Sequence, residues 1–219
     1  LFGNRLLLSA NYYNSRTTDM LYLYNVSVPP FTYNTLLANI GSMRNWGTEI
    51  AIGITPLEAK DMELNINANI TFQRNKLLSL SGMYNGEMLS APEYKSLSGL
   101  DGAGFHGGYN HIVYQMVGQP LGVFYLPHST GLESDGNGGY TYGIADLNGG
   151  GVSLEDGEDR YVAGQAVPKT ILGSNISFRY KRFDLSLQVN GAFGQKIYNG
   201  TSLTYMNMNI FPDYNVMKK

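Results

Sequence analysis

The chain has 219 residues, no cysteine and a formal net charge of −2. With 27 glycines and 17 tyrosines but only 15% charged residues, it favours strands and loops over helices. The small net charge gives no support for a nucleic-acid partner, the lack of cysteine excludes disulfides and thiolate metal sites, and no apolar run is long enough for a transmembrane helix.

Alternation of apolar and polar residues predicts strands along most of the chain. We expect them at 5–16, 44–54, 61–75, 109–116, 121–128, 170–180 and 183–198, and the stretch 202–211 is compatible with an eighth. The longest alternation runs from Asp61 to Gln73, where even positions are apolar and odd positions are polar. At roughly 3.3 Å per residue and a tilt of about 40°, its apolar face is on the order of 25 to 30 Å high, close to the hydrocarbon thickness of a bilayer.

Short connections alternate with long ones between these strands. Lys181 and Arg182 form a two-residue hairpin turn, residues 56–60 join the second and third strands, and residues 117–120 turn the chain between the fourth and fifth. The connections 17–43, 76–108 and 131–169 are long and rich in Gly, Asn, Tyr and Ser. Short turns on one side and long loops on the other are typical of a transmembrane β-barrel.

We therefore predict an all-β chain that is a segment of a large antiparallel transmembrane β-barrel, with short periplasmic turns and long extracellular loops. A soluble β-sandwich also has alternating strands and is the alternative. Long apolar faces and aromatic residues near strand ends favour the barrel. Seven strands do not close a barrel, and open sheet edges cannot face lipid, so we expect an internal fragment of a longer protein.

Several short motifs follow one another in order along nearly the whole chain. They are Asn39-Ile40-Gly41 followed by residues 45–49, residues 75–80, residues 117–125, Asp159-Arg160 with Gly164 and Pro168, and residues 180–185 leading to 194–199. In their order and spacing the chain resembles the SusC-like TonB-dependent transporters of the bacterial outer membrane. The resemblance implies that residues 1–219 are part of the β-barrel domain of a larger transporter and that this chain holds no plug domain.

The resemblance also implies a location and a function. It predicts a multi-pass β-barrel of the bacterial outer membrane that imports oligosaccharides or peptides. The implied partners are a SusD-like surface lipoprotein, TonB acting through a plug region outside this chain, outer-membrane lipid, and the oligosaccharide or peptide substrate. A soluble or surface-attached glycan-binding β-domain with aromatic loops is the alternative function, and a siderophore or cobalamin receptor of the same barrel class is a third.

Aromatic residues near the long connections are candidates for contacts with a substrate or partner. Such rings offer flat faces that stack on sugars or peptide side chains, and tyrosine adds a hydroxyl. The candidates are Tyr22, Tyr24, Phe31, Tyr33, Phe105, Tyr109, Tyr140 and Tyr142. Packing of these rings within the loops or against a partner lipoprotein is the alternative.

The stretch from Asp146 to Gly151 resembles a calcium-binding loop. Asp146, Asn148 and Asp156 are its candidate oxygen ligands, but the set is two ligands short of a complete loop. A plain extracellular turn is the alternative, and we expect no cofactor.

No catalytic constellation is visible, so we do not expect an enzyme. The histidines His106, His111 and His128 lack partner carboxylates or thiolates for a metal site. The acids at 155, 156, 158 and 159 are interpreted as a solvated loop and not as a glycosidase pair, because no apolar pocket is predicted around them.

Overall fold

The computed structural model describes residues 3, 5–92, 94–99, 111–153 and 158–205. Nearly all of its regular structure is antiparallel β-sheet, which confirms the predicted all-β fold. Among these residues no helix has the length and apolar character needed to cross a bilayer. The chain forms two compact units: a first unit of Leu1–Glu93, Met116–Leu121 and Val167–Lys196, and a second unit of Tyr94–Gln115, Gly122–Ala166 and Ile197–Lys219.

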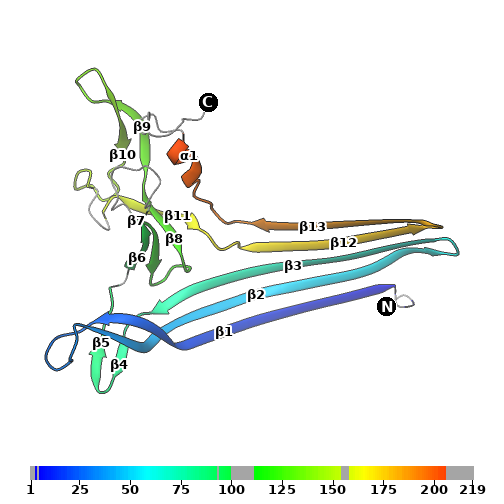
Figure 1. Ribbon diagram of the computed structural model, residues 1–219, viewed down its shortest axis with the longest axis horizontal. Helices are drawn as coiled ribbons and strands as arrows, with labels where there is room; N and C mark the ends of the chain where they lie inside the picture. Colours follow the sequence, from blue (N-terminus) through cyan, green and yellow to red (C-terminus); the bar gives the residue numbers. More distant parts are fainter. Residues whose placement is uncertain (1–2, 4, 93, 100–110, 154–157, 206–219) are drawn as a thin grey trace. The chain divides into compact units, whose positions relative to one another are not determined.

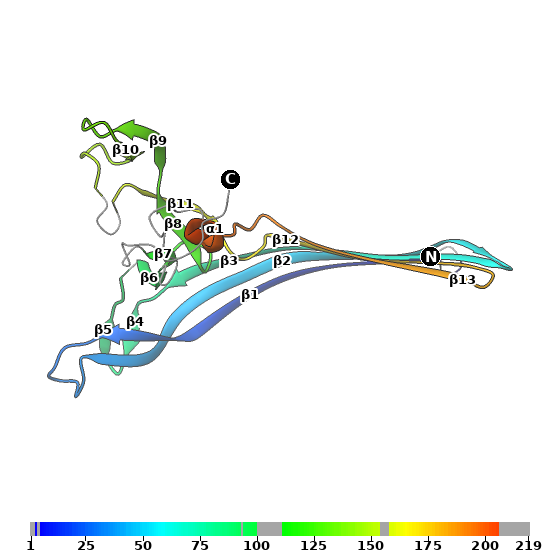
Figure 2. The same ribbon diagram turned by 45° about the horizontal axis from the view of Figure 1, so that its top comes forward.

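The first unit is built on one sheet of five long strands (Figure 1). In spatial order these are β1 (Leu6–Asn25), β2 (Thr35–Ala59), β3 (Met62–Ser79), β12 (Thr170–Tyr180) and β13 (Phe183–Phe193), each antiparallel to its neighbour. Figure 2 shows these strands close to edge-on as a single layer. β3 and β12 are direct neighbours although β4 to β11 lie between them in the sequence.

Two hairpin turns lie side by side at one end of this sheet. Lys181 and Arg182 connect paired residues of β12 and β13, which confirms the predicted two-residue turn. The backbone N–H of Lys181 donates to the carbonyl oxygen of Asp61 over 2.7 Å, which ties this turn to that of β2 and β3. The expected five-residue connection at 56–60 is wrong, because β2 continues to Ala59 after a bulge beyond Ile54.

At the opposite end β1 and β2 continue well past the strands expected at 5–16 and 44–54. Residues 20–25 pair with residues 35–41, so most of the predicted long loop 17–43 is a β-hairpin. Irregular pairing around Asp19, whose φ is +58°, interrupts the alternation at this point. A bulge shifts the phase of apolar and polar positions, which is why the pattern in the sequence ends there.

A compact hydrophobic core lies at this loop end of the sheet. Its buried members are Tyr24, Ala38, Leu77, Leu80, Leu89 and Ala91. The small hairpin of β4 (Gly82–Tyr84) and β5 (Glu87–Leu89) packs here, and Val117 and Leu121 also contact the core. Apolar burial therefore anchors the long connections of the first unit, while the middle of the sheet stays a single layer.

The second unit holds a four-stranded sheet in the order β11 (Arg160–Gln165), β8 (Val123–Pro127), β7 (His111–Met116) and β6 (Tyr94–Gly99). It also holds the hairpin of β9 (Ser129–Ser134) and β10 (Tyr140–Ile144). The strands expected at 109–116 and 121–128 are thus present and antiparallel, but they belong to a sheet separate from the five long strands. The stretch compatible with an eighth strand begins instead in a short helix, α1 (Gly200–Tyr205), and residues 206–211 lie outside the described part.

Close approach of β1, β2 and β3 requires a glycine at position 47. A Cβ at Gly47 would lie 2.6 Å from Tyr13 Oη and closer still to the carbonyl oxygen of Phe72. At Gly53, on the same strand and face, the nearest atom is Asn67 Oδ1 at 3.0 Å, the end of a side chain that can turn away.

We expect Gly47→Ala to destabilise the sheet by about 1–3 kcal/mol, because the obstructing carbonyl belongs to the backbone of β3. Gly53→Ala is the matched control and should change stability by less than about 0.5 kcal/mol. Thermal unfolding of the two purified variants compares them directly. Equal melting temperatures for both would contradict the packing described here.

Candidate functional site

One face of the five-stranded sheet carries polar side chains over the whole central part of the strands. We call it the polar face. On β3 it consists of Asn65, Asn67, Asn69, Thr71 and Gln73. The pairing places β12 residues 173, 175 and 177 and β13 residues 186, 188 and 190 beside them. Because paired residues point to the same side of a sheet, amide and hydroxyl groups form rows across β3, β12 and β13, and Gly173 interrupts the row between Asn69 and Asn190.

A groove of about 350 Å³ runs across the middle of the polar face. Five carboxamides line it: Asn67, Asn69, Asn175, Gln188 and Asn190. Gly53, Gly173 and Ala51 also line it, and their small size leaves the space open, while Leu7 adds an apolar side chain. Carboxamides both donate and accept hydrogen bonds without net charge, so this groove suits an uncharged polar ligand.

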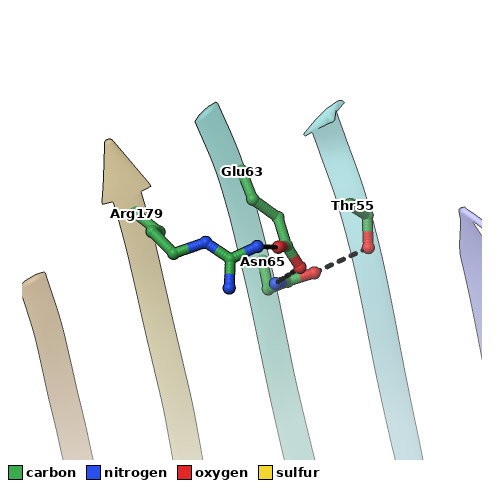
Figure 3. Close-up of polar contacts among 4 residues, drawn as sticks. All are labelled: Thr55, Glu63, Asn65 and Arg179. Carbon is green, nitrogen blue, oxygen red and sulfur yellow. Dashed lines mark hydrogen bonds and ion pairs between the residues drawn. The ribbon is translucent and has the colours of Figure 1, made fainter. Parts of the chain in front are cut away.

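Two charged residues of the polar face, Glu63 and Arg179, contact each other near the short turns (Figure 3). Thr55 Oγ1 donates to Asn65 Oδ1 over 2.7 Å, and Asn65 Nδ2 donates to Glu63 Oε1 over 2.7 Å. Arg179 completes the chain by an ion pair with Glu63, so one polar network joins β2, β3 and β12. A second hollow of about 280 Å³, lined by Asp184 among others, lies at this network.

The alternation along β3 and β12 places Glu63 and Arg179 on polar faces, but it does not reveal their contact. The missing information was the pairing of β3 with β12, which sets Arg179 directly opposite Glu63. Glu63 and Arg179 lie at the same separation from their respective short turns. Once β3 is assumed to pair with β12, this equal separation identifies the two residues as direct neighbours.

The other face of the sheet, the apolar face, is made of aliphatic and aromatic side chains. On β3 it comprises Met62, Leu64, Ile66, Ala68, Ile70 and Phe72, and β2 and β13 contribute Ile50, Ile52, Ile54, Leu185, Leu187, Val189 and Phe193. Many of these side chains are exposed: Leu187 by 51% and Phe193 by 54%. A contiguous exposed apolar surface of this kind marks a site of contact with another protein or with a membrane.

The first unit brings the first four aromatic candidates to its loop end but gives them different environments. Tyr22 and Tyr24 pack edge to face with ring centroids 5.4 Å apart, and Tyr24 is buried in the hydrophobic core. Phe31 is half-buried against the same core, whereas Tyr33 is 75% exposed. Only Tyr33 offers a ring face to a ligand without rearrangement of the core.

Tyr140 and Tyr142 lie on β10 in the second unit, 75% and 72% exposed. They occupy the same side of the strand, and Leu132 of β9 is paired with Tyr142. The pair is therefore an open aromatic surface. Phe105 and Tyr109 lie outside the described residues.

The calcium-loop candidates engage backbone N–H groups. Asp146 accepts hydrogen bonds from Gly149 and Gly151 at 2.6 and 3.0 Å, and Asn148 Oδ1 accepts one from Gly150 at 2.8 Å. These contacts are those of a tight polar turn. Asp156 lies outside the described residues.

Asp159, which the sequence pattern assigned to a solvated loop face, is instead buried and organises this loop. Its carboxylate accepts the backbone N–H groups of Leu147 and Ser153, both at 2.7 Å. These hydrogen bonds, that from Ser153 first, hold the pKa of Asp159 below its ordinary value of 3.8.

The described histidines take structural positions. His128 packs edge to face on Tyr161 at 5.2 Å between ring centroids, and the carbonyl oxygen of His111 accepts a hydrogen bond from Arg160. His106 lies outside the described residues. Across the part of the chain that the structure describes, no three His, Cys, Asp or Glu side chains converge as metal ligands.

Similar proteins are found among curated TonB-dependent receptors. The chain is 29% identical over 216 residues to TonB-dependent receptor P3 of Formosa agariphila, covering 93% of this chain and 20% of that protein. It is 24% identical over 187 residues to TonB-dependent receptor SusC of Bacteroides thetaiotaomicron, covering 85% of this chain and 17% of that receptor. The predicted resemblance is confirmed, and the chain spans about a fifth of the length of these relatives. No family model matches it.

Solved structures share the fold at lower sequence identity. The RagAB peptide importer in the "open-open" state matches with a TM-score of 0.63 and 20% identity, covering 92% of this chain and 20% of that chain. The structure of the RagAB peptide transporter matches with a TM-score of 0.56 and 20% identity, covering 88% and 20%. The fold is thus that of a barrel segment. Receptor and transporter names among the similar proteins accord with the prediction that the chain is not an enzyme.

Removal of the Asp159 charge should release the loop around residues 146–153. We expect Asp159→Asn to accelerate amide exchange at Leu147 and Ser153 by about tenfold or more, since an ionised carboxylate is a stronger hydrogen-bond acceptor than a neutral carboxamide oxygen. Because the folded pKa is depressed, the native loop keeps this stabilisation above pH 3.8 and loses it as the pH falls through the lower folded value.

Asp135→Asn is the control for this experiment. Asp135 also accepts two backbone N–H groups, from Asn137 and Gly139, but it is exposed and lies in another turn. Its substitution should leave exchange at Leu147 and Ser153 unchanged. Native-like protection of these two amides in Asp159→Asn would show that the carboxylate charge does not organise the loop.

Proposed function

We propose that this chain forms part of the barrel wall of an outer-membrane TonB-dependent importer. The single observation that supports it best is the two-faced sheet: five antiparallel strands with an apolar face on one side and a polar face on the other. The similarity to TonB-dependent receptors supports the same conclusion.

The apolar face meets lipid in this proposal. From Met62 to Phe72 it extends about 25 Å along the membrane normal, at roughly 3.3 Å per residue and the tilt usual for barrels. That height equals the apolar band of outer-membrane barrels, which is about 25 Å. Tyr12, Phe72 and Phe193 end the band on the loop side, where aromatic residues belong at an interface.

The polar face lines the lumen, and the short turns face the periplasm. Its central groove of about 350 Å³ carries carboxamides and no charged side chain, which favours a cargo rich in hydroxyl or amide groups. Oligosaccharides and peptides both have this chemistry. The solved structure of a peptide importer with this fold supports the peptide class. The resemblance to SusC-like transporters implies the oligosaccharide class.

The long connections face the cell exterior and meet the cargo or a SusD-like surface lipoprotein. Tyr33 supports this role in the first unit, and Tyr140 and Tyr142 support it in the second, since all three rings are exposed. Energy for import comes from TonB acting through a plug elsewhere in the protein.

A soluble glycan-binding β-domain is the alternative function. It requires the apolar faces of β3 and β13 to be buried against another sheet. Within the first unit these faces lie in the same sheet, and Leu185 and Leu187 of β13 remain 54% and 51% exposed, which favours the membrane protein.

Spin labels at neighbouring positions of β3 test the assignment of the two faces. We expect labels at Ile66 and Ile70 in the reconstituted full transporter to collide mainly with oxygen, which concentrates in lipid. Labels at Asn67 and Asn69 should show a lower ratio of oxygen to water-soluble nickel chelate collisions. The absence of cysteine from this chain simplifies the labelling. No alternation between even and odd positions would contradict the barrel wall.

A transport assay tests the rest of the proposal. Cells that express the full transporter should take up labelled peptides or oligosaccharides, and the uptake should stop when TonB is removed or the inner membrane is de-energised. Uptake that persists without TonB would contradict the proposed energy source.

A further inference from the structure

Three cationic side chains form a row across β1, β2 and β3 at the loop end of the sheet. Arg16 is paired with Arg44, and Arg44 is paired with Lys76. All three are exposed. Directly paired residues lie about 5 Å apart between their Cβ atoms, so three positive charges gather within about 10 Å. We call Arg16, Arg44 and Lys76 the cationic row.

The cationic row lies on the apolar side of the sheet. Along β2 it follows Ile50, Thr48 and Trp46 at intervals of two residues, and two residues keep a side chain on the same face. At roughly 3.3 Å per residue the row lies about 7 Å beyond Trp46 along the strand. In the proposed orientation this is the headgroup region of the leaflet on the loop side.

Among the described residues no acid forms an ion pair with this row. Glu49, Glu58, Glu63 and Asp184 lie on the polar face. Asp19 of β1 lies in the irregular stretch beyond Thr17, where it accepts a hydrogen bond from Thr18, and it forms no ion pair with Arg16. Within the described residues the ion pairs are those of Arg5 with Glu58 and Arg179 with Glu63, both next to the short turns. Like charges at directly paired positions destabilise a sheet, so the row favours an external anion.

Neighbouring side chains hold the central cation in place. Arg44 Nε donates to Asn14 Oδ1 over 2.8 Å, and its guanidinium carbon lies 5.1 Å from the centre of the Trp46 ring. These contacts use Nε and one face of the group, so the terminal NH₂ groups can still form a bidentate pair with a phosphate. Because these contacts already order the Arg44 side chain, less conformational entropy is lost when it binds a ligand.

We propose that the cationic row binds the phosphate group of an anionic lipid in the leaflet on the loop side. The inference rests on the proposed membrane orientation of the sheet. A lipid fits better than a free anion because the row continues directly from the apolar face. Acyl chains can cover Ile50 and Phe72 while the phosphate of the same molecule reaches Arg44 and Lys76. Basic residues at a membrane surface attract anionic lipid in this way.

Lipid retention by the full transporter tests this site. The protein is reconstituted in phosphatidylcholine nanodiscs that contain a minor fraction of phosphorylated lipid A, and bound lipid A is counted by native mass spectrometry. We expect R16Q/R44Q/K76Q to lower lipid A retention about 10- to 100-fold. The control K60Q/K181Q/R182Q removes the same number of charges at the short turns and should change retention less than about twofold.

Two further arms identify the ligand. Dephosphorylated lipid A should not be retained selectively, and inorganic phosphate should not displace lipid A. Displacement by inorganic phosphate would overturn the lipid assignment in favour of a simple anion site. The charge-conserving variant R16K/R44K should restore most of the retention, which separates loss of charge from loss of folding.

Unchanged retention in R16Q/R44Q/K76Q would overturn the inference. The spin-label experiment on β3 separates this failure from failure of the proposed function. If even positions contact lipid while lipid A retention does not depend on the row, only the lipid site is wrong. If even positions do not contact lipid, the barrel assignment itself is wrong.

Discussion

The backbone register of the five long strands is the constraint on which the remaining features depend. A strand alternates its side chains between two faces, so a shift of one residue would exchange the polar and apolar faces. Between Leu6–Ile54 and Thr17–Met43 the pairing of β1 with β2 is regular, and the bulges lie beyond both ends of this interval. The irregular pairs therefore bound the two-faced region and leave it intact.

The register also determines on which face of the sheet each charged side chain lies. On the polar face, Glu63 meets Arg179 and Glu58 meets Arg5 near the short turns, whereas Glu49 lies further along β2 toward the loop end. These partly exposed pairs each contribute little to stability, on the order of 0–1 kcal/mol. Their position also fits the proposed membrane orientation, because carboxylates on the opposite face would then contact lipid at a large cost in free energy. The apolar face consequently tolerates charge only at its loop end.

The sequence predicted the regular part of this architecture well. Strict alternation identified β3, β12 and β13, and Lys181-Arg182 identified the turn between the last two. Prediction stopped where a bulge or a distant pairing decides the structure. The hairpin beyond Asp19 and the pairing of Glu63 with Arg179 depend on contacts that no local pattern records.

Candidate site residues were harder to assign for a similar reason. Tyr24 and Tyr33 have the same side chain and lie in one hairpin region, yet one ring is buried and the other is 75% exposed. Burial depends on the core that Leu77, Leu80 and Leu89 form with Tyr24 from distant parts of the chain. Asp159 likewise follows a run of acidic residues in sequence, and only the folded loop distinguishes it by two backbone hydrogen bonds.

The direct pairing of β3 with β12 explains how one chain combines a regular wall with elaborate loops. Loop-closure entropy grows only with the logarithm of loop length, so a long excursion between adjacent strands costs little more than a short one. All of β4 to β11 is inserted in this connection, which leaves the sheet at the end of β3 and returns to it at the start of β12. The eleven pairs between β3 and β12 fix the wall independently of the insertion. The loop sequences can therefore vary while the register of the five long strands, and with it the two faces, stays the same.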